Sequence, residues 1–142
     1  MTCSPSASVT IRDATEGDVA NVALLIEPFV AQRKLLSRTE QELQRLMPCG
    51  FVAEWDGRVV GFAALEVYSK KIAEIQCLAV AAGYQGQGIG KRLVQCCVER
   101  ARRERVREVM AITSTEGFLR ACGFDFALPE QRKALFLQTR EE

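Results

Sequence analysis

The chain has 142 residues, 48% of them hydrophobic, which suffices for one buried core but not for two. We therefore expect a single domain over residues 9–142, preceded by a flexible start over residues 1–8. Nineteen basic and eighteen acidic side chains give a net charge of +1, which argues against nucleic acid or a membrane surface as a partner. The six cysteines include no Cys-x-x-Cys pair and the chain has no histidine, which argues against a metal site. The sequence shows no signal-like or membrane-spanning segment, which predicts a cytoplasmic protein with reduced thiols.

The first third of the chain predicts a strand and two helices. Val9–Arg12 alternates like a strand, and Thr15 should cap a helix with an acidic first turn, whose end Pro28 should disturb. Thr39, followed three residues later by Glu42, has the pattern of a capping box and predicts a second, shorter helix.

The middle of the chain predicts three antiparallel strands. Phe51–Trp55 and Arg58–Tyr68 flank Asp56-Gly57, a favoured two-residue hairpin turn. Ala73–Val80 follows and is nearly continuously apolar towards its end, as is typical of a strand in the centre of a sheet.

The last third predicts a long helix over Gly88–Arg103, a strand over Val109–Thr113 and a short helix over Glu116–Ala121 that ends at Gly123. Ala134–Gln138 predicts a final strand. This order of elements predicts a mixed α/β fold with several consecutive strands in its middle.

A glycine-rich loop stands between the third strand of the middle group and the long helix, in the sequence LAVAAGYQGQGIGKR. Gly86, Gly88 and Gly90 leave backbone N–H groups unshielded at the positive end of the helix dipole, an arrangement that binds phosphate. The spacing does not match a nucleotide-triphosphate loop or a dinucleotide fold, because no Gly-Lys-Ser/Thr follows and no acidic residue closes the next strand.

The motif Gln85-x-x-Gly88-x-Gly90 after the strand IQCLAV resembles the acyl-CoA pyrophosphate loop of the GCN5-related N-acetyltransferases. Within that superfamily, RKLLSRTEQEL, FVAEWDGRVVGFAAL, AEIQCLAV, GFLRACGF and LPEQRKALFLQTR resemble the acetyltransferase domain of N-acetylglutamate synthases, which acetylate the α-amine of glutamate in arginine biosynthesis. The resemblance implies a mixed, mostly antiparallel central sheet flanked by helices, with splayed central strands, in a short, free-standing form without the kinase-like domain of larger members.

Acetyl-CoA is the cofactor that the resemblance implies. The backbone amides of Gln85–Lys91 would bind its pyrophosphate, and backbone groups of Leu78 and Val80 would pair with the pantetheine arm. A glycine loop that serves only as a tight turn is the alternative. The implied cofactor-binding residues are Leu78, Ala79, Val80, Gln85, Gly86, Gln87, Gly88, Ile89, Gly90 and Lys91.

Without histidine, proton transfer must use carboxylates, hydroxyls or water. Glu74 matches the acidic residue proposed as the general base of the resembling family, acting through a water, although it could equally be an exposed strand residue. Thr113 matches the position that donates a proton to the departing thiolate, with Ser114 as its rival. Leu119 stands where many superfamily members have a tyrosine, and the glutamate synthases likewise lack that tyrosine.

Arginine is the natural partner of a substrate carboxylate, because its planar guanidinium pairs with both oxygens. The resemblance assigns this role to Arg38 and Arg140, and it makes Cys77 a substrate contact through its backbone. Arg140 could also be an ordinary charged residue of the tail, and Glu142 replaces a small hydroxyl of the family.

The sequence therefore predicts an acetyl-CoA-dependent N-acetyltransferase with a small amino-acid substrate, L-glutamate first. The alternatives are a superfamily member that acetylates another small amine or a protein N-terminus, and a non-catalytic acyl-CoA sensor. Strand edges near the C-terminus would favour a homodimer.

Overall fold

A five-stranded sheet organises the computed structural model, which describes residues 8–139 and divides into two units, Met1–Ala111 and Ile112–Glu142. All five strands belong to the first unit. They are β1 (Thr10–Asp13), β2 (Gly50–Trp55), β3 (Arg58–Val67), β4 (Ile72–Val80) and β5 (Glu108–Met110). The first four pair antiparallel in chain order, and β5 is parallel to β4, which confirms the predicted mixed, mostly antiparallel sheet. The expectation of a single domain stays a prediction, and residues 1–7 of the expected flexible start lie outside the described residues.

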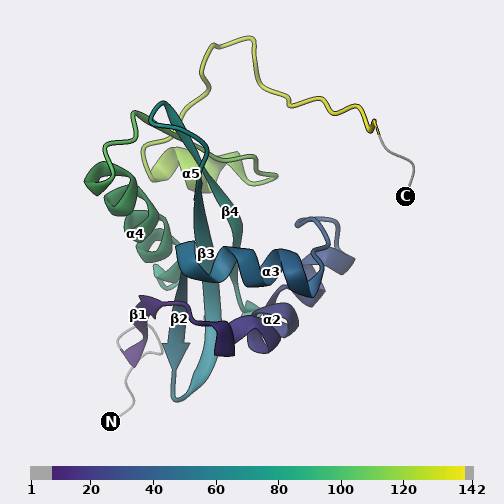
Figure 1. Ribbon diagram of the computed structural model, residues 1–142, viewed down its shortest axis with the longest axis vertical. Helices are drawn as coiled ribbons and strands as arrows, with labels where there is room; N and C mark the ends of the chain where they lie inside the picture. The colour runs from purple at the N-terminus through teal and green to yellow at the C-terminus, as the bar shows by residue number, and fades with distance from the viewer. Residues whose placement is uncertain (1–7, 140–142) are drawn as a thin grey trace. The chain divides into compact units, whose positions relative to one another are not determined.

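Helices cover both faces of this sheet. They are α2 (Val19–Ala31), α3 (Glu40–Leu46) and α4 (Ile89–Arg103), with short 3-10 turns η1 (Glu16–Asp18), η2 (Met47–Cys49) and η3 (Ala82–Tyr84). Figure 1 shows α4 on one side of the sheet and α2 and α3 on the other. Pro28 lies inside α2, which continues to Ala31.

Local hydrogen bonds explain where the helices of the first unit start. Thr39 and Glu42 form the predicted capping box, in which the Glu42 amide donates to Thr39 Oγ1 over 3.1 Å and the Thr39 amide donates to Glu42 Oε1 over 2.8 Å. Before α2, the buried carboxylate of Asp18 accepts from the Thr15 amide and from both terminal nitrogens of Arg12, at 2.8 to 2.9 Å. This ion pair lowers the pKa of Asp18 to about 2, chiefly through the hydrogen bonds from Arg12.

The core on the α2 and α3 side contains Val22, Leu43 and Phe62, all at most 1% exposed. On the α4 side, a Cβ added to Gly61 would lie 3.0 Å from Leu93 Cδ1, so α4 packs directly against the backbone of β3. The sheet is thus the middle layer of three within the first unit, and its strands position the loop that connects β4 to α4.

Strand β4 departs from regular geometry at Cys77, whose φ of 60° lies in the left-handed region. The register with β3 shifts there, since Ala64 faces Gln76 and Phe62 faces Ala79. In a regular strand, residues three positions apart such as Gln76 and Ala79 point to opposite faces of the sheet. Here both lie opposite residues that point to the same face, so the side chains after the bulge point to the other face from the one expected.

The ladder between β4 and β5 is short. It joins Ile72–Glu74 to Glu108–Met110 and goes no further, so the rest of β4 has no strand partner in β5. Strand β5 is paired over its whole length, and the splay of the central strands stays a prediction. The strand expected over Val109–Thr113 ends at Met110 instead, because the ladder that would hold its second half is not formed.

The second unit contains α5 (Glu116–Ala121), which ends at Gly123 with a φ of 99°, confirming the predicted glycine C-cap. The strand expected over Ala134–Gln138 is wrong, because these residues have no regular secondary structure. Leu135, Phe136 and Leu137 are 91%, 73% and 86% exposed, so no partner strand covers this apolar run.

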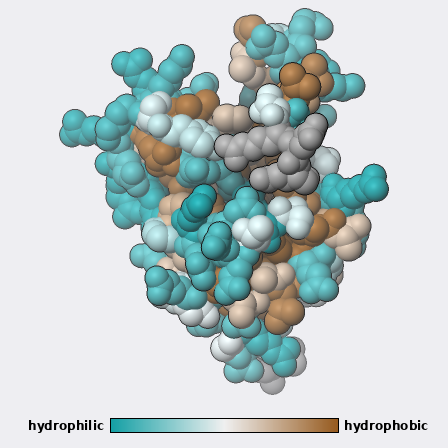
Figure 2. All heavy atoms as spheres, turned by 45° about the vertical axis from the view of Figure 1, so that its right-hand side comes forward, coloured by the Kyte–Doolittle hydropathy of each residue, from teal (hydrophilic) through white to brown (hydrophobic). Residues whose placement is uncertain are grey.

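The surface is mainly hydrophilic on the face that Figure 2 shows, with hydrophobic residues in separate patches between polar ones. Within residues 8–139, no helix combines the length and hydropathy that crossing a bilayer would require.

Candidate active site

The loop after β4 has the backbone that the glycine pattern predicts. Gly86 and Gly88 have φ angles of 79° and 83°, and Gly88 is the N-cap of α4 without a side-chain cap. The first bond of the helix runs from the Arg92 amide to the Gly88 carbonyl, so the amides of Ile89, Gly90 and Lys91 have no acceptor within it. A Cβ at Gly86 or Gly88 would meet nothing within 4 Å, so open space lies before these donors. The arrangement suits an anion.

Side chains anchor this loop to the protein beneath it. Ile89 is 1% exposed and anchors the start of α4 in the core, while Ala79 is 4% exposed, so each could meet a ligand only through its backbone. The Gln85 side chain donates to the Val80 carbonyl over 2.9 Å and ties the loop to the end of β4. Lys91 is exposed, as a cation at the rim of an anion site should be. Leu78, Ala79 and Val80 all lie beyond the end of the ladder with β5.

Arg38 and Cys77, two of the predicted substrate contacts, lie together. Arg38 comes from the segment between α2 and α3. Burial raises the pKa of the Cys77 thiol, and the Arg38 guanidinium is close enough to oppose this rise in part. The Nε of Arg38 is buried and has no hydrogen-bond partner among the described residues. A buried donor without a partner is costly.

Glu74 belongs to a polar cluster formed by Glu66, Tyr68, Glu74 and Gln76 at the other end of β4. The Tyr68 hydroxyl donates to Glu74 Oε1 over 2.6 Å, and the Gln76 amide donates to the Tyr68 oxygen over 3.0 Å and to Glu66 Oε1. Burial, followed by the hydrogen bond to Glu74, raises the pKa of Tyr68 to about 12. Tyr68 is therefore a protonated donor at neutral pH.

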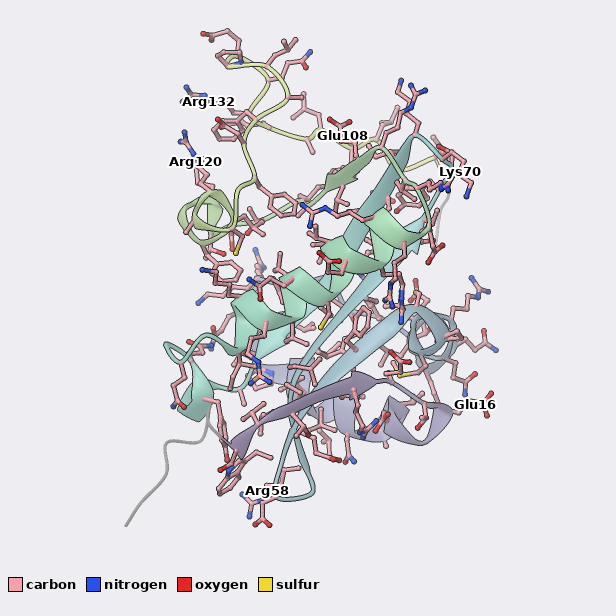
Figure 3. The ribbon with its side chains drawn as sticks, turned by 90° about the vertical axis from the view of Figure 1, so that its left-hand side faces the viewer. Glu16, Arg58, Lys70, Glu108, Arg120 and Arg132 are labelled. Carbon is pink, nitrogen blue, oxygen red and sulfur yellow. The ribbon has the colours of Figure 1, made fainter. Side chains whose placement is uncertain are left out.

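Sequence reasoning missed Tyr68. The available signal was the alternation Glu66-x-Tyr68 on one strand and Glu74-x-Gln76 on the next, but only the register, which opposes Glu66 to Glu74, brings them together. Figure 3 shows Lys70, in the turn between these strands, at the opposite end of β3 from Arg58. Along β4 the order is thus the polar cluster, Cys77, and the cofactor loop.

A pocket of about 560 Å³ lies at the Arg58 end, between α2, the turn before β3 and the segment after β4. Its lining includes Phe29, Lys34 and Gln85, but neither Glu74 nor Cys77 contributes to it. The pocket is therefore separate from the predicted acceptor residues.

The second unit holds the predicted proton donor. Thr113 lies beyond the end of β5, where its Oγ1 accepts from the Thr115 amide over 2.9 Å and lies 3.1 Å from the Thr115 hydroxyl. Leu119 is buried. Arg140 lies outside the described residues, so its role and that of Thr113 stay predictions. Within residues 8–139, no group of three or more histidine, cysteine or acidic residues could hold a metal ion.

Known proteins resemble this chain over most of its length. A family model described as acetyltransferase (GNAT) family matches residues 19–124, more than half of the chain. An uncharacterized N-acetyltransferase of Chlorobaculum tepidum is 30% identical over 120 residues, a match that covers 84% of this chain and 77% of that protein. An amino-acid acetyltransferase of Ralstonia nicotianae is 37% identical over 132 residues, covering 89% of this chain and 29% of the relative.

The structure of N-acetylglutamate synthase from Neisseria gonorrhoeae, solved with coenzyme A and N-acetyl-glutamate, matches with a TM-score of 0.80 at 34% identity, over 87% of this chain and 31% of that one. The present chain spans less than a third of the Ralstonia and Neisseria proteins. These matches confirm the resemblance that the glycine loop and its flanking segments carry. The chain belongs to the acetyltransferase (GNAT) family of N-acetyltransferases.

Proposed function

We propose that this protein transfers the acetyl group of acetyl-CoA to the α-amine of an amino acid, with L-glutamate the first candidate and arginine biosynthesis the corresponding role. The observation that carries the proposal is the order of groups along β4: a carboxylate at Glu74, an arginine beside Cys77, and bare amides after Val80. An amino acid held between Glu74 and Arg38 would present its amine between a base and a cofactor.

The glycine loop supports binding of coenzyme A. The free amides at Ile89–Lys91 would hold the pyrophosphate, and the edge of β4 at Leu78–Val80, which has no strand partner in β5, would hold the pantetheine arm through backbone hydrogen bonds. Bound acetyl-CoA supplies a thioester whose carbonyl carbon the amine attacks, with loss of the coenzyme A thiolate. The Neisseria synthase with the same fold was solved with coenzyme A.

Arg38 supports recognition of a carboxylate. Its buried Nε has no partner among the described residues, and it sits beside Cys77, where the left-handed backbone kinks β4. A substrate carboxylate would satisfy this donor with a charge-assisted hydrogen bond. Arg140 would supply a second arginine for the other carboxylate of glutamate.

Glu74 acts as the general base in this proposal. An α-amino group has a pKa of about 8, so most of the acceptor arrives as an ammonium ion whose lone pair is blocked. Glu74 would take one proton through a water, which frees the lone pair for attack. As the carbon–sulfur bond breaks, the hydroxyl of Thr113, or that of Ser114, would donate its proton to the thiolate sulfur, and the second proton lost by the attacking nitrogen would restore that hydroxyl.

Calorimetry with coenzyme A, followed by release of free thiol from acetyl-CoA with a panel of acceptors, tests the proposal. We expect micromolar binding of coenzyme A and turnover with L-glutamate, L-glutamine or L-aspartate. No uptake of coenzyme A at millimolar concentration would overturn the assignment altogether. Turnover with a peptide N-terminus but with none of the three amino acids would show that the substrate is a protein or peptide and not a free amino acid.

A further inference from the structure

We propose that Tyr68 is a positioning residue for the general base: its hydroxyl holds Oε1 of Glu74, so that the other carboxylate oxygen faces the incoming ammonium. The inference rests on the proposed function, in which Glu74 is the base. Tyr68 itself touches neither substrate nor cofactor in this scheme and acts through Glu74.

The hydrogen bonds of the cluster fix the direction of the phenolic proton. The Gln76 amide nitrogen can only donate, and it donates to both the carboxylate of Glu66 and the oxygen of Tyr68. The phenol therefore accepts from Gln76, and its one proton points to Glu74, 2.6 Å away, rather than to Glu66 at 3.5 Å. Glu66 thus orients Gln76, Gln76 orients Tyr68, and Tyr68 orients Glu74.

The backbone makes Tyr68 a fixed support rather than a loose surface residue. Its amide donates to the Ile72 carbonyl over 3.1 Å, which closes the turn between β3 and β4. The turn is tied to the end of α4, because Lys70 Nζ donates to the Glu104 carbonyl and the Arg107 amide donates to the Lys70 carbonyl, both over 2.9 Å. Figure 3 shows Lys70 beside this end of α4.

The need for such support follows from the position of Glu74. Its side chain is half-buried near the end of the β4–β5 ladder, and a glutamate has three torsions that must be fixed before its oxygen meets an acceptor. Misplacement of a reacting group by about 1 Å can cost up to about a hundredfold in rate. A single short hydrogen bond to one oxygen removes most of that freedom while leaving the second oxygen open.

Tyr68 contributes little to packing, since it is 51% exposed. Removing its hydroxyl as Tyr68→Phe keeps the ring and should leave the melting temperature within a degree or two. The other tyrosine, Tyr84, provides the matched control. It lies in η3, its ring is tilted by 52° against that of Trp55 with the centroids 5.9 Å apart, and it donates no side-chain hydrogen bond to another described residue.

A double-mutant cycle of Tyr68→Phe and Glu74→Gln, measured with saturating acetyl-CoA, tests the inference. We expect Tyr68→Phe to lower kcat about tenfold without changing the KM for acetyl-CoA, and Glu74→Gln to lower kcat by about 10² to 10⁴. The double variant should be no slower than Glu74→Gln alone, because a support is useless once the base is gone. Tyr84→Phe should stay within twofold of the wild type.

Three outcomes would overturn the role of Tyr68. They are a Tyr68→Phe enzyme within twofold of the wild type, losses that simply multiply in the double variant, and a Glu74→Gln enzyme that is nearly as fast as the wild type. All three leave acetyl transfer itself intact. A wild-type protein that binds coenzyme A but acetylates no amino acid would instead overturn the proposed function, and the role of Tyr68 with it.

Discussion

Replacing Gly88 with alanine separates the loop's role in folding from its role in binding. Gly88 has a φ of 83° and caps α4 without a side chain. Holding an L-residue in the left-handed region costs about 1 to 2 kcal/mol, so Gly88→Ala should lower the melting temperature by a few degrees. A Cβ there would meet no protein atom within 4 Å, so no clash adds to this cost.

Gly57 offers a matched control. It has a φ of 75° in the Asp56-Gly57 turn between β2 and β3, and a Cβ added to it would also meet nothing within 4 Å. Gly57→Ala should therefore lose a similar amount of stability. Only Gly88 adjoins the free amides of α4, where a phosphate oxygen must approach an N–H to about 2.9 Å, and a methyl group would intrude.

We expect Gly88→Ala to weaken coenzyme A binding about tenfold or more, which corresponds to about 1.4 kcal/mol, and Gly57→Ala to leave the Kd unchanged. Isothermal titration with coenzyme A and thermal denaturation of both variants provide the two readouts. Equal affinity of the Gly88→Ala protein and the wild type, with equal melting temperatures for the two variants, would refute the idea that the anion occupies this loop.

Three further predictions concern the acceptor side and the core. Arg38→Ala should raise the KM for the amino acid about tenfold or more in steady-state assays and leave that for acetyl-CoA unchanged, while removal of the exposed Arg45 should change neither. Gly50→Ala should lower the free energy of unfolding, measured with urea, by about 2 kcal/mol, because the added Cβ would lie 2.7 Å from a ring carbon of Phe62. The lowered pKa of Asp18, about 2, stabilises the fold above pH 4. Asp18→Asn should thus cost about 2 kcal/mol at pH 7, a difference that shrinks as the pH falls from 4 to 2. A constant difference down to pH 2 would contradict the ion pair.

The parts of the fold that sequence predicts well are those fixed by near neighbours. The capping box at Thr39 and Glu42, the Asp56-Gly57 turn and the glycine loop before α4 each depend on residues within one turn of the chain. Their hydrogen bonds or φ requirements can be read from residue type alone.

The tail and the polar cluster depend on pairing between distant segments. Ala134–Gln138 is a short apolar run of the kind that strands contain, but a strand forms only against a partner, which the sequence does not identify. Likewise, Tyr68 and Glu74 meet only because β3 and β4 adopt one register out of several that an apolar hairpin would allow.

The bulge at Cys77 is the clearest case, because it reverses the alternation expected for half of β4. In a regular strand Glu74, Gln76, Leu78 and Val80 would share a face. The register places Gln76 opposite Ala64 and Ala79 opposite Phe62, so Leu78 and Val80 change sides. A left-handed backbone at a non-glycine residue costs about 1 to 2 kcal/mol, and burial of Cys77 in the core beside Ala79 offsets it.

Because of this reversal, the side chains on one face of β4 are polar just before the bulge and apolar after it. Before the bulge, β4 points polar groups, including Glu74, to the side of the sheet that bears Arg38. After the bulge it buries Ala79 on that same side, which closes the core beneath the cofactor loop, and its backbone edge continues without a strand partner in β5. A regular strand would have placed Glu74 and Ala79 on opposite faces of the sheet. The kink therefore lets the proposed base and the proposed cofactor edge follow one another along a single strand, with the proposed acceptor contact at Cys77 between them.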